Sequence, residues 1–70
     1  SIFKEPEIEI KIAPGIIQVT TAHQIRIKVF TILGRLVSDA TLHPGTSQFN
    51  VPAHGVYIVT AGELTLKVAV

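Results

Sequence analysis

The chain is patterned with a period of two over most of its length. The run EIEIKI at residues 7–12 alternates strictly, which places three isoleucines on one face and three charged residues on the other. Such alternation is typical of a half-buried β-strand. Pro14-Gly15 interrupts the pattern, and the run IIQVT at residues 16–20 follows. Because a Pro-Gly pair favours a turn, the two runs predict a β-hairpin.

Five more extended runs follow, each bounded by turn residues. QIRIKVF at 24–30 is the clearest central strand, and the glycine of ILGR predicts a hairpin turn into a strand at 36–42. A second Pro-Gly turn precedes a short strand at 48–51, and strands at 56–60 and 64–70 form a final hairpin. Seven short strands without any segment of period 3.6 indicate an all-β sandwich or a small barrel. Of these we predict a seven-stranded antiparallel, Ig-like β-sandwich.

Length, composition and charge limit the classes of function that the chain can have. Seventy residues with 47% hydrophobic and 16% charged content form one folded domain rather than a disordered tail. Because a domain of this size buries only about 60% of its unfolded surface, we expect residues 1–70 to be a single domain and a piece of something larger. The six basic and five acidic residues are scattered, which argues against nucleic acid as a partner. No apolar run reaches the roughly 20 residues that span a bilayer, so we expect no membrane insertion.

The three histidines are the candidates for metal ligation or acid–base chemistry. His23, His43 and His54 all fall in predicted turns. If consecutive strands alternate in direction, His23 and His43 lie at one end of the sandwich with Glu63, and His54 lies at the other. A His23/His43/Glu63 cluster stays open, but metal ligands usually show tighter spacing. We therefore expect no metal and no cofactor.

Catalytic motifs are not found in the sequence. It contains no cysteine, no G-x-S-x-G nucleophile elbow and no phosphate-binding G-x-x-x-x-G-K-[ST] loop. Glu7 and Glu9 share a strand face with Lys11, which is typical of a solvated surface rather than of paired catalytic carboxylates. We expect the protein not to be an enzyme.

One strand face is a candidate for ligand binding. Arg26, Lys28 and Phe30 alternate with apolar residues, so they share the outer face of the strand at 24–30. Two cations beside an aromatic ring are able to bind a sugar or an anionic polymer. A plain polar surface is the simpler interpretation, since isolated surface aromatic residues are common.

Two segments together resemble a known family. IRIKVFTILGRLV at 25–37 and HGVYIVTAGELTLKVAV at 54–70 are similar to the C-terminal sorting domains of type IX secretion cargo in Bacteroidetes (Por secretion tails), and to the sorting-domain-like C-terminal modules of Bacteroidales surface proteins. In that family a strand V-x-V-[YF]-x-x-x-G-[RK]-x-V is followed by P-x-G-[VIL]-Y-[IV]-V and a closing K-V-x-V. The residues that match are Val29, Phe30, Gly34, Arg35, Val37, Pro52, Gly55, Val56, Tyr57, Ile58, Val59, Lys67, Val68 and Val70. The P-N-P turn that usually opens the domain is not found in KEPEIEIKIAPG, which favours the sorting-domain-like variant.

The resemblance implies a role and a set of residues. It implies that residues 1–70 are a single C-terminal β-sandwich module of a longer secreted or surface protein. The implied role is that of a non-catalytic sorting or anchoring module that directs the larger protein to secretion and the cell surface, passing through the periplasm. The implied partners are the secretion or surface-attachment machinery and the preceding domain of the same chain, and the closing K-V-x-V is expected to end the protein. The sorting-motif residues are Gly34, Arg35, Gly55, Tyr57, Lys67, Val68 and Val70.

Two other functions stay open. In the first, the domain is an adhesion or carbohydrate-binding β-sandwich whose ligand face is Arg26, Lys28 and Phe30. In the second, it is a structural spacer that packs on the preceding domain. Sorting is expected to depend on the motif residues and glycan binding on the ligand face.

Overall fold

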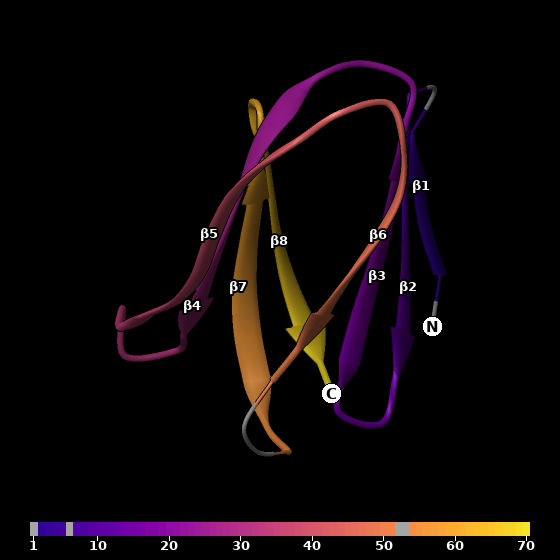
Figure 1. Cartoon of the computed structure of the whole chain (residues 1–70). Coiled ribbons are helices and arrows are strands. Elements are labelled where there is room, and N and C mark those ends of the chain that lie inside the picture. Colours follow the sequence, from indigo (N-terminus) through magenta and orange to yellow (C-terminus); the bar gives the residue numbers. More distant parts are fainter. Residues whose placement is uncertain (1, 6, 52–53) are drawn as a thin grey trace.

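The computed structural model describes residues 2–5, 7–51 and 54–70, and these form two facing antiparallel sheets (Figure 1). The first sheet has the strand order β1-β2-β3-β6 and the second β5-β4-β7-β8. The strands are β1 (Ile2–Glu5), β2 (Ile8–Ala13), β3 (Ile16–Thr21), β4 (Ile25–Thr31), β5 (Leu36–Leu42), β6 (Gly45–Asn50), β7 (Val56–Ala61) and β8 (Leu64–Ala69).

The predicted antiparallel β-sandwich is confirmed. The seven predicted strands correspond to β2–β8, and β4 lies inside its sheet between β5 and β7, as a central strand should. The order β2-β3-β6 facing β5-β4-β7-β8 corresponds to an A-B-E sheet facing a C′-C-F-G sheet of an immunoglobulin-like sandwich. Among the described residues there is no helix long and apolar enough to cross a membrane.

Strand β1 is an addition to the prediction. It pairs with β2 from Ile2↔Lys11 to Glu5↔Ile8 and so lies at the edge of the first sheet. Its sequence IFKE puts two apolar residues side by side and is only four residues long, so it has too little alternation for a periodicity argument. Pairing with the edge of β2, a tertiary interaction, makes this segment a strand.

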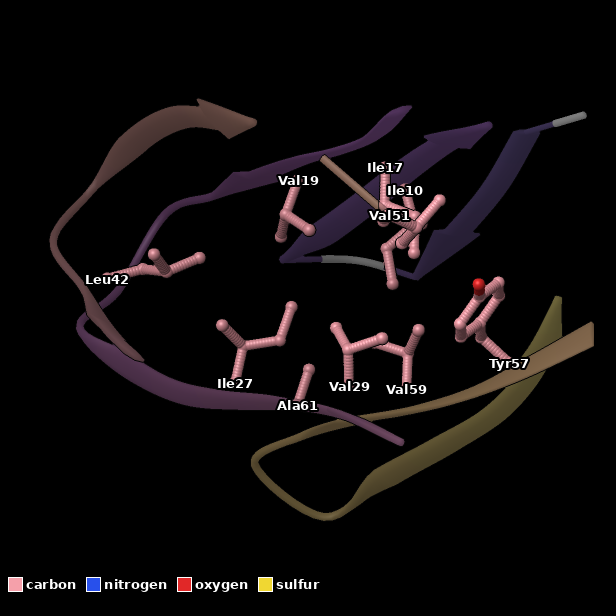
Figure 2. Close-up of a cluster of buried hydrophobic side chains, with 10 residues drawn as sticks. All are labelled: Ile10, Ile17, Val19, Ile27, Val29, Leu42, Val51, Tyr57, Val59 and Ala61. Atoms are coloured by element: carbon pink, nitrogen blue, oxygen red, sulfur yellow. The ribbon is translucent and has the colours of Figure 1, made fainter. Parts of the chain in front are cut away.

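The core lies between the two sheets and follows the predicted alternation. On β3 every second side chain is buried, and on β4 the alternate residues Ile27 and Val29 are buried. Ile17, Val19, Ile27 and Val29 are fully enclosed. β-Branched side chains of this kind pack well on a pleated surface. Figure 2 shows ten buried hydrophobic residues pointing toward one another from both sides of the core: Ile10, Ile17, Val19, Ile27, Val29, Leu42, Val51, Tyr57, Val59 and Ala61.

The connections place particular turns at each end of the sandwich. The chain changes sheets three times, between β3 and β4, between β5 and β6, and between β6 and β7. The lower end in Figure 1 carries the Pro14-Gly15 turn, the turn at 31–35, residues 54–55 and Val70. The upper end carries the turns that contain His23, His43 and Glu63. The predicted separation of His54 from the other two histidines is therefore confirmed.

Candidate functional site

The three blocks of the sorting motif meet at the lower end of the second sheet. Tyr57 pairs with Thr31 of β4 on one side and with Val68 of β8 on the other. Gly55 and Val70 extend the β7–β8 ladder by exchanging backbone hydrogen bonds: the Gly55 N–H donates to the Val70 oxygen at 3.0 Å, and the Val70 N–H donates to the Gly55 oxygen at 2.8 Å. Residues far apart in the sequence thus form one continuous part of the sheet. Pro52 of the motif lies outside the described residues.

The turn that carries Gly34 and Arg35 is fixed by hydrogen bonds to Thr31. The Thr31 carbonyl accepts from the Gly34 N–H at 2.9 Å, and the Thr31 N–H donates to the Arg35 carbonyl at 2.8 Å. The Thr31 hydroxyl also accepts from the Arg35 N–H at 3.1 Å. Gly34 has a φ of +90°, a conformation that glycine adopts without the steric cost paid by other residues. Three hydrogen bonds to Thr31 therefore hold the backbone of this turn in one conformation.

The motif residues divide into buried and exposed groups. Tyr57 is 5% exposed, and its ring points into the space between the sheets (Figure 2). Val68 and Val70 are half-buried and pack against the core. Arg35 and Lys67 are exposed, and among the side chains that the structure describes none forms an ion pair with either. Within the motif, Arg35 and Lys67 are thus the charged side chains available to a partner.

On the predicted ligand face, Asp39 already binds Arg26. Its two carboxylate oxygens accept from Arg26 Nε at 3.0 Å and from Nη2 at 2.8 Å. These hydrogen bonds hold the pKa of Asp39 below its usual value and raise that of Arg26, and the positive charges of Arg26 and Lys28 also favour the Asp39 carboxylate. Lys28 lies opposite Asp39 in the β4–β5 register. The cationic half of the predicted ligand face is therefore partly neutralised within the protein.

Phe30, the third residue of that face, belongs to an apolar row across the second sheet. It pairs with Leu36 of β5 on one side and with Ile58 of β7 on the other, and Ile58 in turn pairs with Lys67 of β8. A β-bulge between Val29 and Phe30 sets this register. Since the neighbours of Phe30 and Ile58 along their strands point into the core, the row lies on the outer face.

More apolar side chains extend this row at the lower end. Leu33 is 94% exposed, Ile32 55%, Leu36 50% and Val56 36%, and these are the exposed large hydrophobic residues of the described chain. Ile32 and Leu33 form the turn after β4, which projects from the end of the sheet (Figure 1). Together with the row they make a surface that we name the apolar tip patch, consisting of Phe30, Ile32, Leu33, Leu36, Val56 and Ile58.

Sequence reasoning identified Phe30 in this patch but placed it in a different group of residues. A signal for the patch is present in the sequence, since the segment TILGRL puts two large apolar residues in a hairpin turn, where Gly, Asn, Asp and Ser are usual. The joining of Leu36 and Ile58 to Phe30 depends on the register of three strands and on the bulge, which the alternation pattern does not specify.

The described histidines do not form a metal centre. His23 Nε2 lies 2.9 Å from Glu7 Oε1, so its neighbour is the β1–β2 turn. Within the described part of the chain no group of three or more His, Cys, Asp or Glu residues could hold a metal ion. His54 instead lines a pocket of about 210 Å³ at the lower end, together with Ile12, Ala13, Pro14, Ala69 and Val70. That volume is below the roughly 300–1,000 Å³ usual for small-molecule sites.

Comparison with known proteins gives the family of the chain. Residues 2–70 match the model of a family described as a domain of unknown function (DUF6383), and the chain belongs to this family. No curated protein matches the chain. No solved structure matches it either.

Proposed function

We propose that this DUF6383 domain is a non-catalytic sorting or anchoring module that directs a larger protein to secretion and the cell surface. Its partners are the secretion or surface-attachment machinery and the preceding domain of the same chain. The observation that carries the proposal is that the three motif blocks, which are separate in sequence, lie on neighbouring strands. Val29 and Phe30 of β4 pair with Val59 and Ile58 of β7, and Tyr57 of β7 pairs with Val68 of β8. Gly34 and Arg35 lie in the turn that follows β4. A motif read by a partner has to lie on one part of the folded domain, and the strands that carry this motif are neighbours in one sheet.

The motif residues have two distinct roles in this proposal. The two glycines shape the turns, and Tyr57, Val68 and Val70 hold β7 and β8 on the core. Arg35 and Lys67 are exposed and contact the partner. Because charge-assisted contacts favour carboxylate or phosphate groups, the recognised surface of the machinery is acidic.

Localisation of a reporter protein tests the proposal. Residues 1–70 are fused behind a signal peptide and a soluble reporter in a Bacteroidetes host, and a twin fusion lacks Thr65–Val70. Sorting predicts that the intact fusion reaches the cell surface and that the truncated one, with its expression verified, stays in the periplasm. If the intact, folded fusion also stays in the periplasm, sorting in this host is wrong and the domain is an adhesion module or a spacer.

The truncation has a structural consequence that needs a control. It removes most of β8, which covers the edge of β7 and contributes the half-buried Leu66, Val68 and Val70. An uncovered strand edge favours aggregation, so the truncated fusion loses the fold as well as the motif. Single substitutions at exposed motif residues, described in the Discussion, separate the two effects.

A further inference from the structure

The apolar tip patch brings apolar side chains to the surface at the lower end of the sandwich. Leu33, with 94% of its surface exposed, stands at the apex of the turn after β4, and Ile32 beside it is 55% exposed. Phe30 and Ile58, which pair across β4 and β7, are half-buried. Large apolar side chains gathered at one surface usually mark a binding site.

The charges around this patch are positive. Arg35 lies in the same turn as Leu33, Lys67 ends the row next to Ile58, and Lys28 lies two positions before Phe30 on β4. The described Asp and Glu side chains are already engaged or lie far from the patch. Asp39 binds Arg26, Glu7 and Glu9 lie near His23 and Lys11, and Glu63 lies at the upper end. The ligand of the patch therefore combines an apolar layer with negative charge.

From these observations we propose that the apolar tip patch, with Arg35 and Lys67, is a peripheral binding surface for an anionic lipid bilayer. Ile32 and Leu33 enter the boundary between head groups and acyl chains, while Arg35 and Lys67 stay at the level of the anionic head groups. Apolar side chains flanked by Lys and Arg are the usual composition of interfacial membrane-binding elements. No segment spans the bilayer in this arrangement.

The shape and charge of the patch favour a bilayer over a second copy of the chain. A symmetric dimer through this surface would bring like charges of the two copies close together, including both Arg35 side chains, which costs free energy. A projecting turn with Leu33 at its apex needs a matching socket in a protein partner, whereas a fluid bilayer accommodates it without one. The proposal goes beyond sorting, because lipid binding can be measured whether or not the domain acts as a sorting signal.

Sedimentation with lipid vesicles tests the proposal. Residues 1–70 are mixed with vesicles made of equal parts phosphatidylcholine and phosphatidylglycerol, and with vesicles of phosphatidylcholine alone. Partial insertion of Ile32 and Leu33 together with the charges of Arg35 and Lys67 gives only weak binding. The domain is therefore expected to sediment with the anionic vesicles at lipid concentrations of roughly 1 mM. Binding to the neutral vesicles is at least about tenfold weaker, and added salt weakens binding to the anionic ones.

Substitutions at exposed positions assign the binding to the patch. Leu33→Ser lowers the partition coefficient by about tenfold, and Arg35→Gln and Lys67→Gln each lower it by about fivefold. The matched controls are Ala22→Ser in a turn at the upper end and Lys11→Gln on the first sheet, and both bind as the parent does. Urea denaturation of each variant verifies that it is folded.

Two results would overturn the proposal. One is that the folded domain stays in the supernatant with anionic vesicles at millimolar lipid, which would assign the patch to a protein partner. The other is that Leu33→Ser and Lys67→Gln bind as well as Ala22→Ser and Lys11→Gln, which would place the lipid contact elsewhere.

Discussion

Gly55 and Val70 exchange two backbone hydrogen bonds of 3.0 and 2.8 Å, one pair beyond the last register pair of β7 and β8. The first residue of the G-[VIL]-Y block is thereby joined to the last residue of K-V-x-V. The pair holds the end of β8 on the sheet at the point where Val70 packs against the core. Two residues that the resemblance assigned to recognition are thus also structural.

Substitution of Gly55 should weaken the domain through backbone strain. Gly55 has a φ of +151°, and a Cβ added there would meet nothing within 4 Å, so the cost is conformational rather than steric. We expect Gly55→Ala to lower the free energy of unfolding by about 1–3 kcal/mol, measured by urea denaturation. Ala69→Ser, at the exposed neighbouring position on β8, should change it by less than about 0.5 kcal/mol. Equal effects of the two variants would contradict this role of Gly55.

The loss of stability caused by an Ile→Val substitution should be larger at Ile27 than at Ile32, because only Ile27 is buried. Ile27 is fully buried between the sheets, whereas Ile32 is 55% exposed in the turn. Removing one methylene from Ile27 leaves a space in a close-packed core, so Ile27→Val should cost about 1 kcal/mol of stability. Ile32→Val should cost less than about 0.5 kcal/mol. If Ile32→Val lowered the urea midpoint as much as Ile27→Val does, the side chain of Ile32 would have to be buried in the isolated domain.

The Arg26–Asp39 pair should make stability depend on pH at the acidic end. The hydrogen bonds from Arg26 lower the pKa of Asp39 below its ordinary value of 3.8. Because the pKa in the folded state is below that in the unfolded state, the contribution is present above the unfolded value and is lost as the pH falls through the folded value. The stability difference between the parent and Asp39→Asn should therefore shrink once the pH drops below about 4.

Denaturation with urea at several pH values, for the parent and each variant, measures this difference. Glu63→Gln is the control, because Glu63 has no ion-pair partner among the described side chains. Arg26→Gln should remove the effect of Asp39→Asn in a double-mutant cycle. A parent-to-variant difference that stays constant down to strongly acidic pH would show that the pair does not contribute in this way.

Most of the fold could be predicted from the sequence, since alternation identifies seven of the eight strands. The alternating apolar residues of β3 and β4 include the fully buried Ile17, Val19, Ile27 and Val29. Turn residues also predicted the hairpins, including that at Gly34. Strand β1 could not be predicted, because its four residues become a strand through pairing with β2. Neither could the three changes of sheet, since alternation indicates which face is buried but not which strand is the neighbour.

The candidate site was less predictable than the fold. Arg26 and Lys28 were correctly placed on one face, but the carboxylate that binds Arg26 comes from β5, thirteen residues away. Tyr57 was identified through the resemblance as a motif residue, and the structure buries its ring in the core. The apolar tip patch forms only when β5, β4 and β7 are in register, because the bulge after Val29 sets Leu36 opposite Phe30.

Surface delivery of a reporter fused to residues 1–70, with and without the charges of Arg35 and Lys67, tests the sorting account most directly. Both side chains are exposed and unpaired among the described residues, so the double variant Arg35→Gln/Lys67→Gln should keep the parent's urea midpoint. If the domain is a sorting signal that the machinery recognises through Arg35 and Lys67, the double variant stays in the periplasm. The control Lys11→Gln, on the opposite sheet, then reaches the cell surface. Delivery of the folded double variant to the surface as efficiently as the control would contradict the account.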